Sequence, residues 1–140
     1  MSYLLDTCVI SELARPAPNA AVIEWVASQS EDELYISVLT LGELEKGIAK
    51  LPLSDRRIHL ENWVRKSLTQ RFHSRLLPID APVASRWGAM AGGAEWKGQP
   101  LPVIDALLAA TSHHHDLIVA TRNTRGFERC GARCINPWVP

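Results

Sequence analysis

Short apolar runs alternate with longer amphipathic segments along this chain, a pattern that predicts strands separated by helices. Apolar or β-favouring runs at residues 3–6, 34–37, 75–80 and 116–121 are predicted strands, and residues 133–138 are predicted as a final edge strand. Strands that alternate with helices form parallel sheets with helices on both faces. We therefore expect an α/β fold with a parallel sheet of four to five strands sandwiched between helices. The pattern leaves the order of the strands open.

Helices are predicted where apolar residues recur three and four positions apart. Asn19 can cap one helix, and Thr40 with Glu43 has the spacing of a capping box at the start of another. Asp80 fits the cap of a third helix, which the glycine pair 92–93 is expected to end. The predicted helical segments are residues 9–14, 22–26, 40–50, 56–72, 81–90 and 102–114, with a loop or short turn over 121–128.

Composition narrows the class of protein. The 140 residues fit one domain, 1–140, and 46% hydrophobic with 21% charged residues is the profile of a soluble globular protein. No apolar run reaches the roughly 18 residues of a membrane span, and no signal-peptide pattern begins the chain, so we expect a cytoplasmic protein without membrane contact. Cys8, Cys130 and Cys134 lack C-x-x-C spacing, which indicates neither a disulfide framework nor a zinc site.

Three acids stand near predicted strand–helix junctions. Asp6 ends the first strand, Glu43 follows the second, and Asp105 stands among aliphatic residues of a predicted helix. Each has an ordinary structural interpretation: a helix cap for Asp6, a capping-box partner for Glu43, and a water-filled gap or an arginine partner for Asp105. A bound cation would instead offset the cost of burying Asp105.

Read together, the three acids indicate a metal site. Ligands collect at the carboxyl ends of strands in open α/β sheets, and clustered carboxylates repel unless a cation lies among them. Hard divalent ions such as Mg²⁺ take carboxylate oxygens. Asp6, Glu43 and Asp105 therefore form a candidate Mg²⁺ or Mn²⁺ pocket suited to phosphodiester hydrolysis, with Thr121 and Asn123 at a fourth corner.

Several polar residues lie near this pocket in the sequence. Thr7 and Ser37 are expected to support a carboxylate or a metal-bound water, or to serve as local caps. Arg122 and Arg125 are expected to hold a phosphate backbone, or to be solvated loop charges. The histidines at 113–115 cannot all face one ion on a helix and suit its negative end. The net formal charge is zero, which removes global steering toward nucleic acid but allows a local basic rim.

Six stretches of the sequence resemble those of PIN-domain proteins, and within them the VapC-type ribonuclease toxins of toxin–antitoxin pairs. The stretches are L-L-D-T-C-V-I-S-E-L, T-L-G-E-L-E-K-G-I, L-P-I-D-A-P-V-A, P-V-I-D-A-L-L-A-A-T, I-V-A-T-R-N-T-R-G-F-E and I-N-P-W. The resemblance implies a PIN-like fold, an RNA substrate cut to a 5′-phosphate and a 3′-hydroxyl, and a VapB-like antitoxin partner. It also implies a homodimer and contact with operator DNA through the antitoxin.

By the same resemblance, Asp6, Glu43 and Asp105 match the three core acids, and Asn123 stands where many members carry a fourth. Three positions depart from the family pattern: an amide at Asn123, no carboxylate at Gly126, and Cys8 in place of the usual asparagine. We expect a site that binds one ion firmly and a second weakly or only with RNA.

Two other functions stay open from the sequence. A catalytically weak PIN domain would act as a binding or DNA-regulatory subunit, which the residues at 123 and 126 allow. A receiver-like phosphoacceptor domain would use Asp80, but it needs paired acids after the first strand and a lysine after the last core strand. The sequence has D-T and T-R-N at those places.

Overall fold

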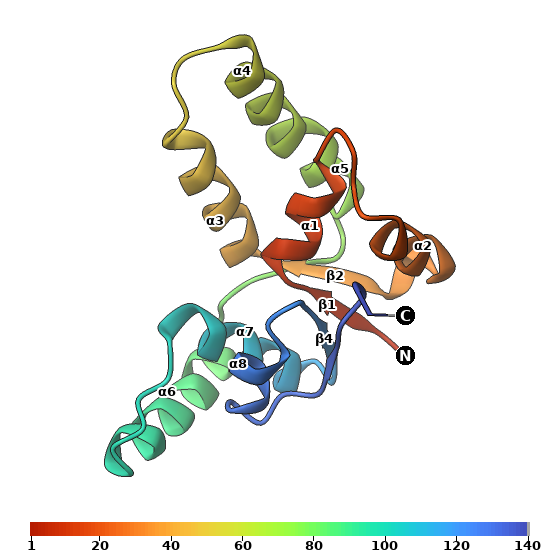
Figure 1. Cartoon of the computed structure of the whole chain (residues 1–140). Helices are drawn as coiled ribbons and strands as arrows, with labels where there is room; N and C mark the ends of the chain where they lie inside the picture. Colours follow the sequence, from red (N-terminus) through yellow and green to blue (C-terminus); the bar gives the residue numbers. More distant parts are fainter. Residues whose placement is uncertain (140) are drawn as a thin grey trace.

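The computed structural model describes residues 1–139. Its centre is a parallel sheet of five strands between helices, as the α/β pattern predicted (Figure 1). The order of the strands, which the sequence left open, is β3-β2-β1-β4-β5. The strands are β1 (Tyr3–Leu5), β2 (Leu34–Ser37), β3 (Leu76–Leu77), β4 (Ile118–Ala120) and β5 (Cys134–Ile135). The strand predicted over residues 75–80 is shorter than expected, and β5 lies at the edge of the sheet, as predicted.

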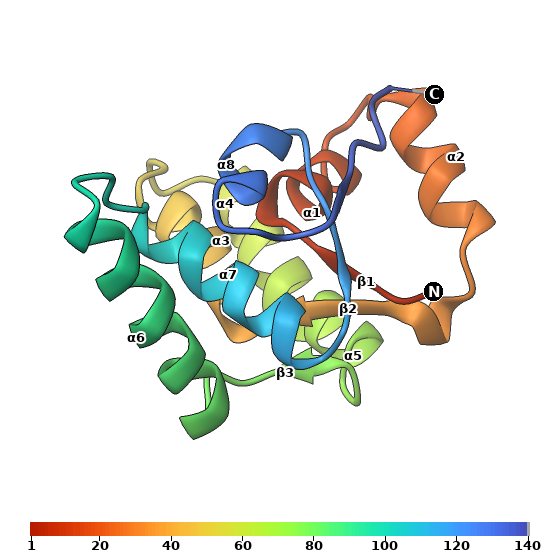
Figure 2. The same ribbon diagram turned by 90° about the horizontal axis from the view of Figure 1, so that it is seen from below.

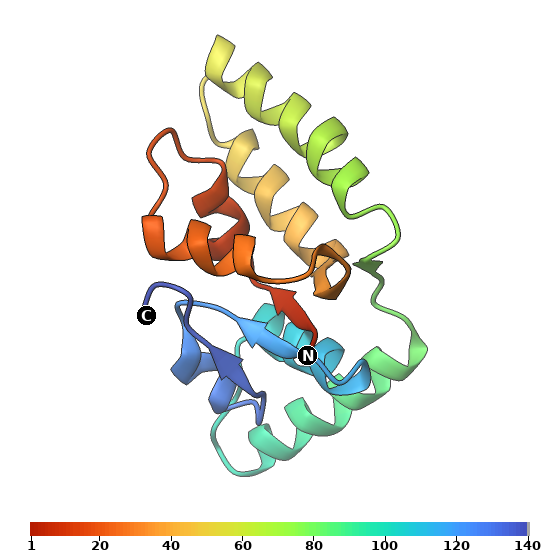
Figure 3. The ribbon, with the colours of Figure 1, turned by 90° about the vertical axis from the view of Figure 1, so that its right-hand side faces the viewer.

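Helices cover both faces of this sheet (Figures 2 and 3). No helix within residues 1–139 is long and apolar enough to cross a membrane. The helices are α1 (Thr7–Leu13), α2 (Ala20–Ser28), a 3₁₀ turn (Glu31–Glu33), α3 (Val38–Ala49), α4 (Asp55–Asn62), a π-helical segment (Trp63–Leu68), α5 (Thr69–Arg71), α6 (Ala81–Trp96), α7 (Val103–His114) and α8 (Thr124–Glu128).

Strand alternation builds a separate apolar core on each face of the sheet. Tyr3 and Leu5 of β1 pack with residues of α1 and α2, whereas Leu4 between them packs with residues of α7 and α8. Successive side chains of a strand point to opposite faces, so a wholly apolar strand must be covered on both. The buried runs that predicted the strands are explained by this two-sided packing.

At two helix boundaries the local rule used for the sequence-based prediction is wrong. Helix α3 begins at Val38, because the Ser37 hydroxyl accepts the Leu39 backbone N–H at 3.0 Å and caps the helix. Thr40 is therefore buried inside α3 rather than at its start, and the capping box with Glu43 is wrong. Helix α6 runs on through the glycine pair 92–93, which does not end it.

Strand order decides where the functional candidates meet. Because β1 is central, its carboxyl end lies between the carboxyl ends of β2 and β4. Asp6 follows β1, α3 follows β2, and Thr121 follows β4, so all three arrive at one edge of the sheet. This edge is where ligands bind in open α/β sheets.

Candidate active site

Asp6 is held by hydrogen bonds to both of its carboxylate oxygens. Its Oδ1 accepts the Thr7 backbone N–H at 2.8 Å and caps α1, and its Oδ2 accepts the Thr121 hydroxyl at 2.7 Å. The Cys8 thiol also donates to Oδ2, at 3.5 Å. The predicted cap is therefore confirmed for Asp6, and the hydrogen bonds to both oxygens fix the orientation of its carboxylate.

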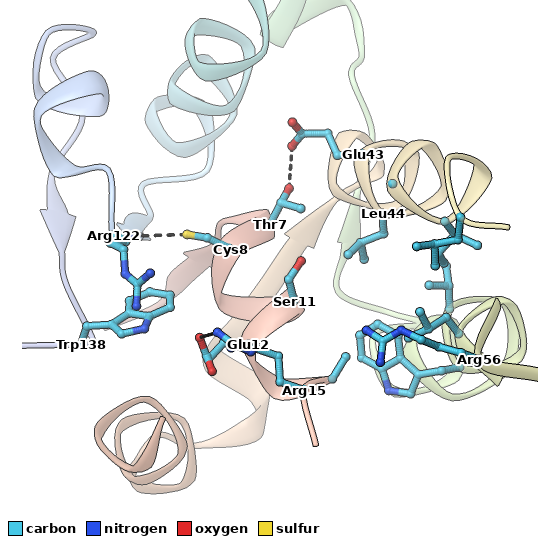
Figure 4. A pocket seen from close by; sticks show the side chains of 17 residues that line it. Thr7, Cys8, Ser11, Glu12, Arg15, Glu43, Leu44, Arg56, Arg122 and Trp138 are labelled. Atoms are coloured by element: carbon cyan, nitrogen blue, oxygen red, sulfur yellow. Dashed lines mark hydrogen bonds and ion pairs between the residues drawn. The ribbon is translucent and has the colours of Figure 1, made fainter. Parts of the chain in front are cut away.

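Glu43 is tied to the first helix by a side-chain hydrogen bond. The Thr7 hydroxyl donates to Glu43 Oε1 at 2.5 Å, across 36 residues of sequence (Figure 4). Glu43 lies in the second turn of α3, not the first as expected, because that helix starts at Val38. Thr7 thus joins Asp6 and Glu43, through its backbone N–H to one and its hydroxyl to the other.

Asp105 lies in the first turn of α7 rather than in the middle of the helix, and its side chain is half-buried. Burial and the nearby negative charges of Asp6 and then Glu43 raise the pKa of the Asp105 carboxyl above its usual range. The three acids therefore act on one another electrostatically. The structure brings Asp6, Glu43 and Asp105 to the same side of the sheet, as their positions in the sequence predicted.

The donor chemistry of this cluster fits a hard divalent cation. None of the three acids forms an ion pair with a lysine or arginine anywhere in residues 1–139, so no resident cation neutralises them. Within that part of the chain, no three histidine, cysteine, aspartate or glutamate side chains lie, as placed, so that they could hold a metal ion together. Three mutually repelling carboxylates with free lone pairs are nevertheless the oxygen set that Mg²⁺ and Mn²⁺ accept.

The loop after β4 contacts two of the three acids. The fully buried Thr121 hydroxyl donates to Asp6 and accepts the Asn123 backbone N–H at 2.9 Å. The Asn123 side chain uses both of its ends: Oδ1 accepts the Gly126 backbone N–H at 3.3 Å, and Nδ2 donates to Asp105 Oδ2 at 3.4 Å. Thr121 and Asn123 therefore lie where the sequence placed them, with the nitrogen of Asn123 toward the acids.

The other residues predicted to support the site or bind RNA lie in different environments. Arg122 stacks on the Trp138 ring at 4.3 Å and donates its backbone N–H to Cys8 Sγ at 3.5 Å, so it lies on the rim of the site. Arg125 is exposed on α8. Ser37 is fully buried as the cap of α3, so the local-cap interpretation describes its contacts.

A groove of about 450 Å³ begins at the site and runs between α1, α3 and α4 (Figure 4). Leu44, Ile48, Leu60 and Trp63 give it apolar walls. Its polar lining comes from Thr7, Cys8, Ser11, Glu12, Arg15, Glu43, Arg56 and Arg122. Arg15 and Arg56 were not predicted here, since single arginines far apart in the sequence carry no spacing signal for a shared groove.

Glu12 is the other missed residue, a glutamate only 5% exposed in α1. Its Oε2 accepts the Asn19 backbone N–H at 3.0 Å, and its Oε1 lies 3.5 Å from Arg15 Nη1. These contacts hold the turn between α1 and α2. The only signal for this role in the sequence is a glutamate in a short apolar helix that an R-P-A-P turn follows.

The remaining polar candidates make local contacts, mainly at helix ends. His113 Nε2 lies 3.2 Å from the Cys130 carbonyl oxygen at the end of α7, consistent with a helix end rather than a metal site. Asp80 caps α6 by accepting the Val83 N–H at 3.2 Å, as predicted. The three cysteines are free thiols. Burial and then the Asp6 charge raise the pKa of the Cys8 thiol, so it lacks the lowered pKa of a reactive nucleophile.

Comparison with known proteins places this arrangement in a family. Residues 3–132 match the PIN domain. The chain is 36% identical over 137 residues to the VapC ribonuclease Y4jK of Sinorhizobium fredii, with 98% of each chain covered. It is 37% identical over 135 residues to the toxin FitB of Neisseria gonorrhoeae, covering 96% of this chain and 97% of FitB.

Solved structures of similar fold cover nearly the whole length of this chain. FitAcB from Neisseria gonorrhoeae has a TM-score of 0.91 at 36% identity, with 99% of each chain covered. FitAB bound to an IR36 DNA fragment has a TM-score of 0.90 at 35% identity, covering 99% of this chain and 96% of that one. Because sequence and fold agree across these matches, the chain belongs to the PIN-domain family, and its relatives within that family are the VapC and FitB toxins.

Proposed function

We propose that this protein is a divalent-cation-dependent endoribonuclease and the toxin of a toxin–antitoxin pair. The observation that carries the proposal is the meeting of Asp6, Glu43 and Asp105 at the carboxyl ends of the strands, where Thr7 bonds to both Asp6 and Glu43, and Thr121 and Asn123 connect Asp6 to Asp105. Burial, and then the charges of Asp6 and Glu43, raise the pKa of the Asp105 carboxyl. Relatives named as a ribonuclease and a toxin cover almost the whole chain. Family membership leaves the receiver-like alternative without support.

In this proposal Asp6, Glu43 and Asp105 hold Mg²⁺ or Mn²⁺. The bound ion supplies Lewis-acid polarisation of the scissile phosphate and a lower pKa for the attacking water. Thr121 and Thr7 hold the Asp6 carboxylate in one orientation, and Thr7 also fixes Glu43. Arg122 and Arg125, on the loop and helix beside the acids, bind the RNA backbone through its phosphates.

The cleavage test compares two matched asparagine variants. Purified protein with Mg²⁺ or Mn²⁺ is expected to cut RNA to 5′-phosphate and 3′-hydroxyl ends, and Asp105→Asn is expected to lower the rate by at least about 100-fold, as loss of a group that acts in the transition state does. Asp116→Asn is the control, because Asp116 is an exposed acid with a φ of 55°, a conformation that asparagine also accepts. Equal rates in the two variants would refute the assignment.

A second function is favoured by one observation. Asn123 turns an N–H group toward Asp105 where many relatives are expected to carry an acid. RNA binding without cleavage in Mg²⁺ and in Mn²⁺ would support a catalytically weak PIN domain that acts as a binding or DNA-regulatory subunit.

We propose that a VapB-like antitoxin binds in the groove between α1, α3 and α4. The toxin–antitoxin pair would contact operator DNA through the antitoxin, as FitAB contacts its DNA fragment. A homodimer of this chain is also proposed. Leu60→Arg, inside the groove, is expected to abolish co-purification with a co-expressed antitoxin. Ile58→Arg, on the same helix but outside the groove, is expected to leave it intact. Equal capture by both variants would contradict binding in this groove.

A further inference from the structure

The side chain of Asn123 is committed at both ends, and this limits what it can do at the acidic cluster. Its Oδ1 accepts the Gly126 N–H and caps α8, so its Nδ2 is the atom that faces Asp105. An amide nitrogen has no lone pair to offer a cation, and it only donates hydrogen bonds. Turning the oxygen toward the acids would break the cap of α8 and the bond to Asp105 together.

Asn123 also reaches the second acid of the site through Thr121. Its backbone N–H donates to Thr121 Oγ1 at 2.9 Å, and that hydroxyl donates in turn to Asp6 Oδ2 at 2.7 Å. One residue therefore contacts Asp105 directly and Asp6 through one intermediate. Side chains that orient metal ligands from outside in this way commonly change metal affinity when they are replaced.

Gly126 is what makes room for this arrangement. A Cβ at position 126 would lie 3.0 Å from Asn123 Cγ and 3.0 Å from its Oδ1, and closer still to Nδ2. Any other residue at 126 would push the amide out of its position between α8 and Asp105. By contrast, a Cβ at Gly88, an exposed helical glycine in α6, would meet nothing within 4 Å.

We propose that Asn123 and Gly126 form a positioning pair: Asn123 orients Asp105 as a hydrogen-bond donor, without being a cation ligand, and Gly126 is required for it to do so. The acidic cluster then offers three carboxylates and takes one divalent cation per chain. This inference rests on the proposed cation site. It goes beyond that site because it narrows the sequence-based expectation, one firmly bound ion and a weaker second, to a single ion, and because it gives a role to a glycine.

The first experiment needs no metal. In the metal-free protein the Asn123 side-chain NH₂ resonance, observed by ¹⁵N NMR and assigned by its loss in Asn123→Ser, is expected to shift in Asp105→Asn and in Gly126→Ala. It is expected to stay unchanged in Gly88→Ala. Serine retains the ability to cap α8, so the assignment variant leaves the helix start in place. If the chemical shift of the Asn123 NH₂ group is the same in Gly126→Ala as in Gly88→Ala, the positioning pair is wrong.

The second experiment counts Mn²⁺ ions by calorimetry and by loss of the free-ion EPR signal. The unmodified protein is expected to bind one ion, and Asn123→Ser and Gly126→Ala to bind one ion about 10-fold more weakly, the low end for an outer positioning contact. Asn123→Asp adds a fourth carboxylate that can still cap α8, and it is expected to bind two ions. Two ions in the unmodified protein, or one in Asn123→Asp, would overturn the inference.

The two proposals fail in different ways. If the unmodified protein takes up no Mn²⁺, the proposed cation site is wrong and the one-ion assignment falls with it, while the NMR result still decides the amide contact. If it takes up one ion and the variants at 123 and 126 match Gly88→Ala in affinity, the cation site stands and the positioning pair is wrong. A folding defect in Gly126→Ala would leave the decision to the two variants at 123.

Discussion

Replacing Thr121 with valine tests how much of the site is held in place by a single hydroxyl. Thr121 is fully buried, donates to Asp6 Oδ2 at 2.7 Å and accepts the Asn123 N–H at 2.9 Å. Valine has nearly the same shape, so the substitution removes these two hydrogen bonds and the 3.8 Å contact of the hydroxyl with Cys8 Sγ, and it leaves the packing almost unchanged. It places a methyl group against a carboxylate that loses one of its donors.

The expected loss of stability follows from which of these hydrogen bonds is to a charged group. A hydrogen bond to a charged group contributes about 1.5–3 kcal/mol. The Asn123 N–H adds little, because that residue is exposed and water can replace the lost acceptor. Thr121→Val should therefore lower the free energy of unfolding by about 2 kcal/mol. At about 3 °C per kcal/mol for a chain of this size, the Tm falls by about 6 °C.

Thr111→Val is the matched control. Thr111 is also fully buried, but its hydroxyl donates to the Leu107 carbonyl of the same helix at 2.8 Å. The Leu107 carbonyl also accepts a backbone hydrogen bond of the helix. Loss of the Thr111 hydroxyl should therefore lower the free energy of unfolding by less than about 1 kcal/mol. Urea unfolding of both variants, with and without Mn²⁺, measures the difference. Equal costs for the two, or unchanged Mn²⁺ affinity in Thr121→Val, would refute the argument that this hydroxyl organises Asp6.

Two further perturbations have defined outcomes. Because burial and the charges of Asp6 and Glu43 raise the pKa of Asp105 in the folded protein, its ionised form destabilises the metal-free fold. Asp105→Asn is therefore expected to raise the free energy of unfolding at pH 7 to 8, with the gain disappearing as pH falls below the ordinary carboxyl value of about 3.9; urea titrations across pH that show a gain at low pH instead would contradict this. Phe72→Ala is expected to cost about 3–5 kcal/mol, because Phe72 is fully buried beneath the Arg71 and Arg75 guanidiniums, at 5.3 and 4.9 Å from the ring centre. Phe72→Leu, which keeps most of the volume, should lose less than half as much in the same assay, and equal losses would show that the core does not depend on filling this space.

Prediction from the sequence succeeded where the signal was local. The strand at Leu34–Ser37 and the caps at Asn19 and Asp80 depend on residues within a few positions of each other. It failed at Thr40 and at the glycine pair 92–93, where a local rule competed with packing. Thr40 and Glu43 have the spacing of a capping box. Ser37, the last residue of β2, caps the helix three residues earlier. The glycines lie in a long helix that packs on α7, which outweighs their low helix propensity.

The sequence by itself determined the α/β class, the approximate places of the strands and the acids that follow them, because apolar periodicity and residue type act over a few neighbouring positions. Only the tertiary structure decided the strand order, the Thr7–Glu43 bond across 36 residues, the Thr121–Asp6 bond across 115, and the direction in which the Asn123 amide faces. Such contacts join residues that are distant along the chain, and no local pattern encodes them. The geometry of the acidic site exists only once the central strand has brought its neighbours to one edge.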